Sequence, residues 1–232
     1  MAHWGNVNPP GSLTMKEEFG LYVILTAPAA GYEECARAAV AAGVRYLQLR
    51  VKDRPAAEIL EIACELQKIT ASTATRLIVN DSPEIAAAAG ADGVHLGQED
   101  MPLAEARKIL TRPGAIFGLS THNAEQARAA IALGPDYIGV GPVFPTPTKA
   151  KPDPVLGPEE MGRIIRSSPL TAVAIGGING ENLPRVLEEG ARNFAAVRPI
   201  MSAPSPREAI TRLQRIWRGI LFPDGRGGTG GG

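Results

Sequence analysis

Short apolar runs alternate along the chain with longer stretches in which apolar positions recur at helical spacing. Runs of about four to eight apolar or alternating residues, rich in β-branched types, are typical of strands. Eight such runs occur: LYVILTA from 21, YLQLRVK from 46, RLIVND from 76, GVHLG from 93, IFGLST from 116, YIGVGPV from 137, LTAVAIGG from 170 and FAAVRPI from 194. The pattern therefore predicts eight β-strands.

Ala-, Leu- and Glu-rich stretches between the strands predict helices, and several end in a glycine at a helix C-cap, as YEECARAAVAAG (32–43) and NAEQARAAIALG (123–134) do. Each parallel strand needs a crossover helix, so eight units in about 200 residues favour a closed (β/α)8 TIM barrel of the α/β class. The alternative is an open doubly wound sheet. That fold has a glycine-rich nucleotide fingerprint after its first strand, and no GxGxxG follows the first strand here.

The barrel is predicted to span residues 19–220 as one catalytic domain. Residues 1–18 show no periodicity and are predicted to form a flexible extension, in which Met15 is an alternative natural start. The glycine-rich tail, residues 221–232, is predicted to be disordered.

Composition narrows the class of partner. The chain of 232 residues has 24 Lys and Arg against 24 Asp and Glu and no basic run, which argues against nucleic acid or an anionic membrane and favours small-molecule substrates. Cys35 and Cys64 lie in helical patterns and are interpreted as buried residues in a reducing compartment. With no apolar stretch near the roughly 20 residues of a membrane span and no signal-peptide core, a cytoplasmic protein is predicted.

Chemistry is expected where the strands end, because barrel enzymes build their active sites there. Alternation along the second strand directs Gln48, Arg50 and Lys52 toward the barrel interior or its mouth. Two neighbouring cations favour an anion site, since burying like charges together is costly without a compensating anion. The alternative is that they pair with carboxylates such as Asp81 in a structural network.

Two aspartates follow neighbouring strands: Asn80-Asp81 ends the third, and the segment after the fourth reaches Asp100. Carboxylates together with phosphate oxygens suit Mg²⁺, a hard ion that prefers oxygen ligands. The alternative is that each aspartate caps the helix that follows it.

The fifth strand delivers Ser120 and His122. A catalytic triad is not favoured, because the chain shows no nucleophile elbow and no defined third member. Asn123 is expected to cap the next helix. His95, inside the fourth strand, is expected to be a hydrogen-bonded interior histidine rather than a metal ligand.

Thr146, Thr148 and Lys149 follow the sixth strand, and Gly177 ends the seventh. Barrels frequently bind phosphate after strands seven and eight, where glycine lets backbone amides approach, although a Gly-Gly turn also serves loop geometry alone. The pattern predicts two anionic groups: a phosphate near strands six to eight, and a more highly charged, magnesium-bound group near strands two to four. Lys149 is expected to reach between them.

Five ordered segments resemble the signature segments of the thiamine-phosphate synthase family, over roughly residues 20–215. They are QLRVKD, IVNDSPEIAAAAGADGVHLGQEDMP, GLSTH, YIGVGPVFPTPTK and AIGGING. The resemblance implies a transferase that joins a hydroxymethylpyrimidine pyrophosphate to a thiazole phosphate, giving thiamine phosphate and pyrophosphate. It further implies Mg²⁺ dependence and dissociation to a carbocation-like pyrimidine before the thiazole nitrogen attacks.

The resemblance also implies a role for each candidate residue. Gln48 would contact the pyrimidine, and Ser120 would hydrogen-bond near the leaving group. The remaining sets are Arg50, Lys52, Asn80 and Lys149 for the pyrophosphate, Asp81 and Asp100 for Mg²⁺, and Thr146, Thr148 and Gly177, with Val197 and Arg198, for the thiazole phosphate. The residues expected to act in catalysis are Arg50, Lys52, Ser120 and Lys149.

Arg198 departs from the family pattern, which commonly has a small or hydroxyl residue after the eighth strand. It is expected either to make a charge-assisted contact to the thiazole phosphate or to form an ion pair or face the surface.

Three other functions stay open. A thiazole tautomerase shares the barrel and uses a histidine near the fifth strand, where this chain has His122. A non-catalytic thiamine-phosphate-binding regulatory barrel is the second, because fold alone does not imply activity. A sugar-phosphate isomerase explains the strand-seven glycines but not the basic and acidic residues of strands two to four. The sequence leaves open whether copies of the chain form a homo-oligomer.

Overall fold

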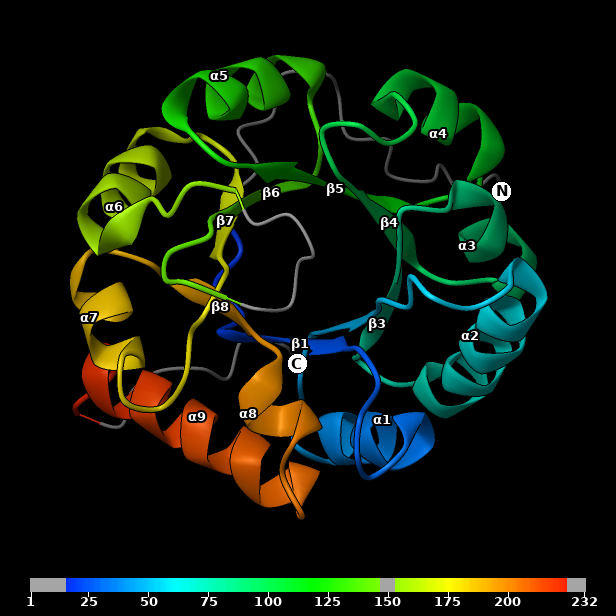
Figure 1. Cartoon of the computed structure of the whole chain (residues 1–232), viewed down its shortest axis with the longest axis horizontal. Helices are drawn as coiled ribbons and strands as arrows, with labels where there is room; N and C mark the ends of the chain where they lie inside the picture. The colour runs from blue at the N-terminus through cyan, green and yellow to red at the C-terminus, as the bar shows by residue number, and fades with distance from the viewer. Residues whose placement is uncertain (1–15, 147–152, 225–232) are drawn as a thin grey trace, which may run out of the picture.

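The computed structural model describes residues 16–146 and 153–224 and confirms the predicted (β/α)8 barrel. All neighbouring strands are parallel, and the first pairs with the last, so the sheet has no edge (Figure 1). The strands are β1 Leu21–Leu25, β2 Tyr46–Leu49, β3 Arg76–Asn80, β4 Gly93–Leu96, β5 Ile116–Thr121, β6 Tyr137–Val140, β7 Thr171–Ala174 and β8 Asn193–Ala196.

Helices surround the barrel on its outside (Figure 1). They are α1 Tyr32–Ala41, α2 Ala56–Thr70, α3 Pro83–Ala89, α4 Leu103–Ile109, α5 Ala124–Leu133, α6 Gly157–Ser167, α7 Leu183–Glu188, α8 Arg198–Met201 and α9 Pro206–Leu221. None of these helices is both long and apolar enough to cross a membrane.

Alternation within the strands divides the apolar residues between two cores. Leu21, Val23 and Leu25 of β1 pack in the layer between strands and helices. Tyr22 and Ile24 belong to a smaller cluster inside the barrel. Because successive strand side chains point to opposite faces, one short apolar run serves both layers.

The predicted strands were too long at two places that matter for the site. β2 ends at Leu49, so Arg50 and Lys52 lie just beyond it. β8 ends at Ala196, and the residues predicted to continue it form the short helix α8, which begins at Arg198. Pro199 explains the second difference, because proline has no N–H for a strand ladder but suits the first turn of a helix.

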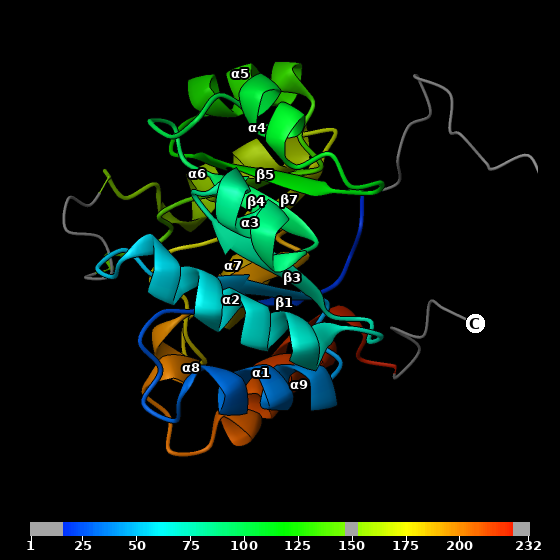
Figure 2. The same ribbon diagram turned by 90° about the vertical axis from the view of Figure 1, so that its right-hand side faces the viewer.

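The two described ends of the chain lie at one end of the barrel, opposite helix α8 and the loop that leads into α2 (Figure 2). Most of the predicted extension, residues 1–15, lies outside the described residues, as does the tail from residue 225. Glu17 accepts hydrogen bonds from the Tyr46 hydroxyl (2.7 Å) and Arg45 (3.0 Å). Asn193 Oδ1 accepts from the backbone N–H groups of Phe19 (2.7 Å) and Gly20 (3.0 Å). Residues 17–20 therefore close this end of the barrel.

Asn193→Ala should lower the free energy of unfolding by about 2–4 kcal/mol, because it leaves buried backbone groups without partners. Asn193 is 2% exposed and also donates to the Glu17 carbonyl. Urea unfolding measures the loss, with Asn123→Ala as the control, since that residue only caps α5 and its loss should cost about 1 kcal/mol. Equal losses in the two variants would contradict the assignment.

Candidate active site

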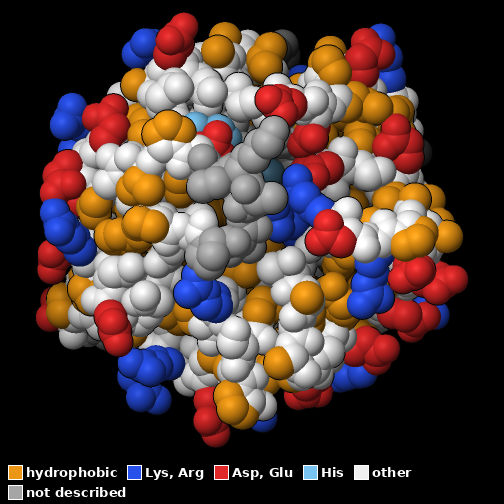
Figure 3. Space-filling model, in the orientation of Figure 1, with side chains coloured by type: hydrophobic (Ala, Val, Ile, Leu, Met, Phe, Trp, Pro, Cys, Tyr) orange, Lys and Arg blue, Asp and Glu red, His pale blue; other side chains and the backbone are white. Residues whose placement is uncertain are grey.

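A cavity of about 1010 Å³ opens at the barrel end where the strands finish. Residues from all eight strands line it, among them Tyr22 of β1, Gln48 of β2 and Ser120 of β5. Figure 3 views the molecule onto this opening and shows basic and acidic side chains next to one another near its centre, on the side of β3 and β4. Barrel closure thus brings together residues that are far apart in sequence.

The basic side of the cavity follows β2, as the alternation predicted. Arg50 and Lys52 both line it, and Lys52 Nζ lies 3.0 Å from Asp81 Oδ2. Burial lowers the pKa of Arg50, and the negative charges of Asp81 and Asp53 oppose that shift. An arginine keeps its charge in proteins, so a partly buried cation faces the cavity. Lys52 forms the ion pair with Asp81 that the sequence offered as an alternative, and both residues of the pair line the cavity.

The two aspartates lie side by side and cap no helix. The cap of α3 is Ser82, whose side chain accepts from Ile85 N–H, and the residue before α4 is Pro102. Asp81 has φ 64°, a left-handed backbone uncommon outside glycine. The capping alternative is therefore wrong for both aspartates.

Asp100 is held against the strand end by a backbone contact. Its Oδ2 accepts from the Gly97 N–H at 2.6 Å. A Cβ on residue 97 would lie 2.9 Å from that oxygen, so any larger residue would have to displace the Asp100 carboxylate. Burial and then a hydrogen bond to Asp81 raise the pKa of Asp100. Two carboxyls close enough to share a proton are also close enough to share a cation.

The donor set fits Mg²⁺, which commonly uses one or two protein carboxylates and completes its shell with water and substrate phosphate. Lys52 engages one oxygen of Asp81, and Gly97 engages one oxygen of Asp100. Within the described residues, no group of three or more His, Cys, Asp or Glu side chains is arranged to hold a metal. The two aspartates would therefore need oxygens from a bound ligand or from water.

Ser120 and His122 of the β5 end do not form a triad. Ser120 Oγ lies 2.9 Å from His95 Nε2. His122 Nδ1 donates to the Gly141 carbonyl at 2.7 Å, and its Nε2 lies 3.5 Å from Asp153. Asn123 caps α5 through Gln126 N–H, and His95 is a hydrogen-bonded interior residue, both as predicted.

The opposite side of the cavity is formed after β7 and β8. Gly176 and Gly177 have positive φ values of 101° and 66°, and a Cβ on either would lie within 2.7 Å of Pro142 or Phe144. Both glycines are thus required by the packing of this loop. A phosphate contact by the Gly177 amide stays a prediction.

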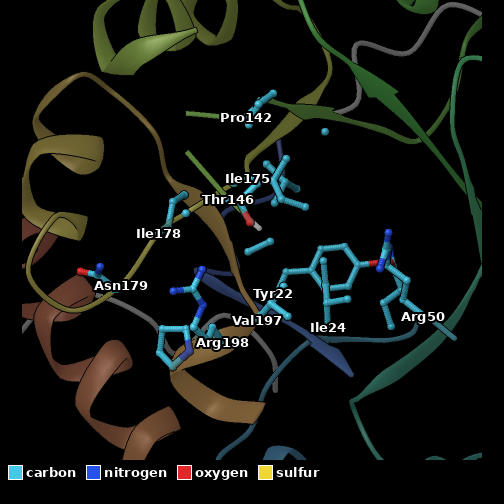
Figure 4. Close-up of a pocket in the computed structure, with 18 of the residues that line it drawn as sticks. Tyr22, Ile24, Arg50, Pro142, Thr146, Ile175, Ile178, Asn179, Val197 and Arg198 are labelled. Atoms are coloured by element: carbon cyan, nitrogen blue, oxygen red, sulfur yellow. The ribbon is translucent and has the colours of Figure 1, made fainter. Parts of the chain in front are cut away.

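Figure 4 shows Arg198 and Arg50 on opposite sides of the cavity, with Tyr22, Ile24 and Val197 between them. The Arg198 guanidinium is directed toward the side where Ile178 and Thr146 lie. Arg198 is exposed and lines the cavity, so a contact to the thiazole phosphate and the surface-directed alternative both stay predictions. Thr148 and Lys149 lie outside the described residues.

Two residues that line the cavity were not predicted from the sequence. Tyr22 and Tyr137 are 2% and 4% exposed, and their hydroxyls lie 2.9 Å apart on the cavity floor. The available signal was a phenol at an inward-facing position of each strand. It is weak, because tyrosines in strands are common.

Asp100→Asn should raise the melting temperature of the metal-free protein at pH 7–8, by at most roughly 2–4 °C. A carboxyl whose pKa is raised by folding destabilises the folded state when ionised, fully so above the raised pKa. Asparagine stays neutral and still accepts from Gly97. The gain in melting temperature should therefore vanish as the pH falls below the pKa that the Asp100 carboxyl has in the unfolded chain. Thermal unfolding across this range is the measurement, and a gain that grows in acid would contradict the assignment.

Comparison with known proteins agrees with this geometry. The family model described as thiamine monophosphate synthase matches residues 21–200. A putative thiamine-phosphate synthase of Geobacter sulfurreducens is 41% identical over 201 residues, covering 85% of this chain and 94% of that protein. A thiamine-phosphate synthase of Gloeobacter violaceus is 44% identical over 200 residues, covering 86% of this chain and 58% of that longer protein.

A solved structure supports the same assignment. The thiamine phosphate pyrophosphorylase from Pyrococcus furiosus superposes with a TM-score of 0.79 at 36% identity, covering 88% of this chain and 98% of that one. The resemblance found in the sequence is confirmed, because the family model spans nearly the whole barrel and the relatives match over most of the chain. The chain belongs to the thiamine monophosphate synthase family, and it is an enzyme of the transferase class.

Proposed function

We propose that this enzyme transfers a hydroxymethylpyrimidine group from its pyrophosphate to a thiazole phosphate, with the help of Mg²⁺. The observation that carries the proposal is the pairing, in one cavity, of Arg50 and Lys52 with the Asp81–Asp100 carboxyls. A pyrophosphate needs cations, and a divalent ion needs carboxylates. The combination suits a magnesium-bound pyrophosphate better than a single phosphate.

The pyrophosphate would lie between Arg50, Lys52 and Asn80 on one side and the carboxyl pair on the other. Mg²⁺ held by Asp81 and Asp100 would neutralise charge on the pyrophosphate oxygens. Arg50 and Lys52 add fixed positive charge where negative charge accumulates as the carbon–oxygen bond breaks, which is the most effective place for electrostatic catalysis. Among the predicted contributors, Lys149 and Thr148 lie outside the described residues and stay predictions.

The thiazole phosphate would bind on the opposite side, near Thr146, Gly177, Val197 and Arg198. Apolar side chains between the two sides offer surfaces for the two rings, among them Ile24, Ile175 and Ile178. Gln48, 2% exposed at the cavity floor, would select the pyrimidine through its amide. Holding both rings in line would let the thiazole nitrogen capture the cation-like carbon. No protein nucleophile is required.

The rival functions use less of this cavity. A thiazole tautomerase has no need for the pyrophosphate side, although His122 lies in the cavity wall. A regulatory barrel would bind thiamine phosphate without turnover.

A cytoplasmic location stays a prediction from the sequence.

Thiamine phosphate formation from the two substrates should require Mg²⁺ and disappear in EDTA. Asp100→Ala should reduce kcat/KM by about 10²-fold or more, because it removes half of the carboxyl pair. Glu99→Ala is the matched control, since the neighbouring carboxylate is exposed and does not line the cavity, and it should retain wild-type activity. Turnover in EDTA, or binding of both substrates without product, would refute the proposal.

Arg198→Ala should raise the KM for the thiazole phosphate by about tenfold, the effect of losing one charge-assisted hydrogen bond. Steady-state kinetics with the pyrimidine substrate saturating measures the change. Arg207→Ala, an exposed cation on α9 that does not line the cavity, is the control. An unchanged KM would mean that Arg198 does not contact this phosphate.

A further inference from the structure

A continuous chain of hydrogen bonds crosses the floor of the cavity. Gln48 Nε2 donates to the Tyr22 hydroxyl at 3.1 Å, and the Tyr22 and Tyr137 hydroxyls lie 2.9 Å apart. The Tyr137 hydroxyl lies 2.9 Å from His95 Nδ1, and His95 Nε2 lies 2.9 Å from Ser120 Oγ. These five residues, from β2, β1, β6, β4 and β5, are here called the inner relay.

The inner relay is shielded from water except at its Ser120 end. Gln48, Tyr22, Tyr137 and His95 are each less than 9% exposed. Gly118 makes room for it: a Cβ there would lie 2.2 Å from Tyr137 Cζ and 2.5 Å from His95 Nδ1. A glycine at this strand position therefore permits the imidazole and the phenol to meet.

The number of protons on these groups determines which group donates and which accepts in each hydrogen bond of the inner relay. Burial holds the pKa of both phenols well above the usual range, so each keeps its single proton. A neutral imidazole donates from one ring nitrogen and accepts at the other. If Gln48 donates to Tyr22, then Tyr22 donates to Tyr137, Tyr137 donates to His95 Nδ1, and His95 Nε2–H donates to Ser120 Oγ.

The Ser120 proton is then left to point into the cavity. We propose that the inner relay makes Ser120 a hydrogen-bond donor to the substrate, with Tyr22, Tyr137 and His95 acting as positioning residues. The inference rests on the proposed function, in which Gln48 meets the pyrimidine and Ser120 lies near the leaving group. A donor is what the oxygens of a departing pyrophosphate need.

The relay also couples pyrimidine recognition to Ser120. With its Nε2 engaged by Tyr22, Gln48 keeps its Oε1 for the exocyclic amine of an aminopyrimidine. A ring with a carbonyl at that position would instead favour a Gln48 amide rotated by about 180°, with Nε2 toward the ring and Oε1 toward Tyr22. Donor and acceptor would then exchange roles in every hydrogen bond of the inner relay. Ser120 would then donate to His95 and present only its oxygen to the substrate. The orientation of the Gln48 amide thus determines whether the Ser120 hydroxyl donates to the substrate or only accepts from it.

The direction of the relay is measurable without turnover. Nitrogen-15 NMR of the ligand-free full chain at about pH 8, where an ordinary histidine is neutral, should show His95 protonated on Nε2. His122 is an internal control that should be protonated on Nδ1, because its Nδ1 faces a carbonyl that can only accept. The chain has three histidines, so His95→Gln and His122→Gln assign the signals. Protonation of His95 on Nδ1 would overturn the proposal.

The positioning role is measured by kinetics. Tyr137→Phe removes one hydroxyl from the relay and should lower kcat by about tenfold with little change in either KM. In Tyr137→Phe/Ser120→Ala, kcat should fall no further than in Ser120→Ala alone, since the two changes remove the same interaction. Tyr46→Phe is the matched control: its ring belongs to the same aromatic cluster, but its hydroxyl binds Glu17 outside the relay. Its kcat should stay within about twofold of wild type.

Additive losses in the double variant, or a normal kcat in Tyr137→Phe, would overturn the positioning role. If Tyr137→Phe does not fold, Tyr22→Phe removes the neighbouring link and should give the same non-additive loss. A wild-type protein that forms no thiamine phosphate would refute the proposed function and with it the role of Ser120 in transfer. The NMR result would then still decide the direction of the relay.

Discussion

Closure of the parallel barrel is the constraint on which the site depends. Every strand must run in the same direction, so the carboxyl ends of all eight meet around one opening. Residues from Tyr22 to Ala195 consequently line one cavity although they span most of the chain. The chemistry is then set by short loops and strand ends, while the helices and the outer faces of the strands supply the stabilising core.

Glycines at three places let groups that line the site come closer than side chains would allow. Gly97 admits the Asp100 carboxylate, Gly118 admits the contact between Tyr137 and His95, and Gly177 packs beneath Phe144. Gly97 and Gly177 lie just beyond the ends of β4 and β7, and Gly118 lies within β5, where the neighbouring strands hold the backbone. The site is thus formed by close backbone approach as much as by the reactive side chains themselves.

Much of the fold could be predicted from the sequence, because the β-branched runs and the intervening helical periods are both strong signals. Arg50, Lys52, Asp81 and Asp100 were predicted to line the site because strand alternation and barrel topology determine where they point. The end of β8 was not predicted, since an apolar run does not reveal where a strand becomes a helix. The inner relay was not predicted either, because its hydrogen bonds join strands whose relative register only the closed barrel defines.

The charged groups of the site balance one another before any substrate arrives. Lys52 pairs with Asp81, and Asp81 shares a hydrogen bond with Asp100. A bare pyrophosphate would be attracted by Arg50 and Lys52 but repelled by the carboxylates, and a bare divalent cation would meet the reverse. If the cation and the pyrophosphate bind together, the cation would offset the charge of the carboxylates, and the pyrophosphate would offset the charge of Arg50 and Lys52. In the proposed function, this arrangement would favour the metal-bound pyrophosphate over either component, because two pairs of opposite charges lie at adjoining strand ends.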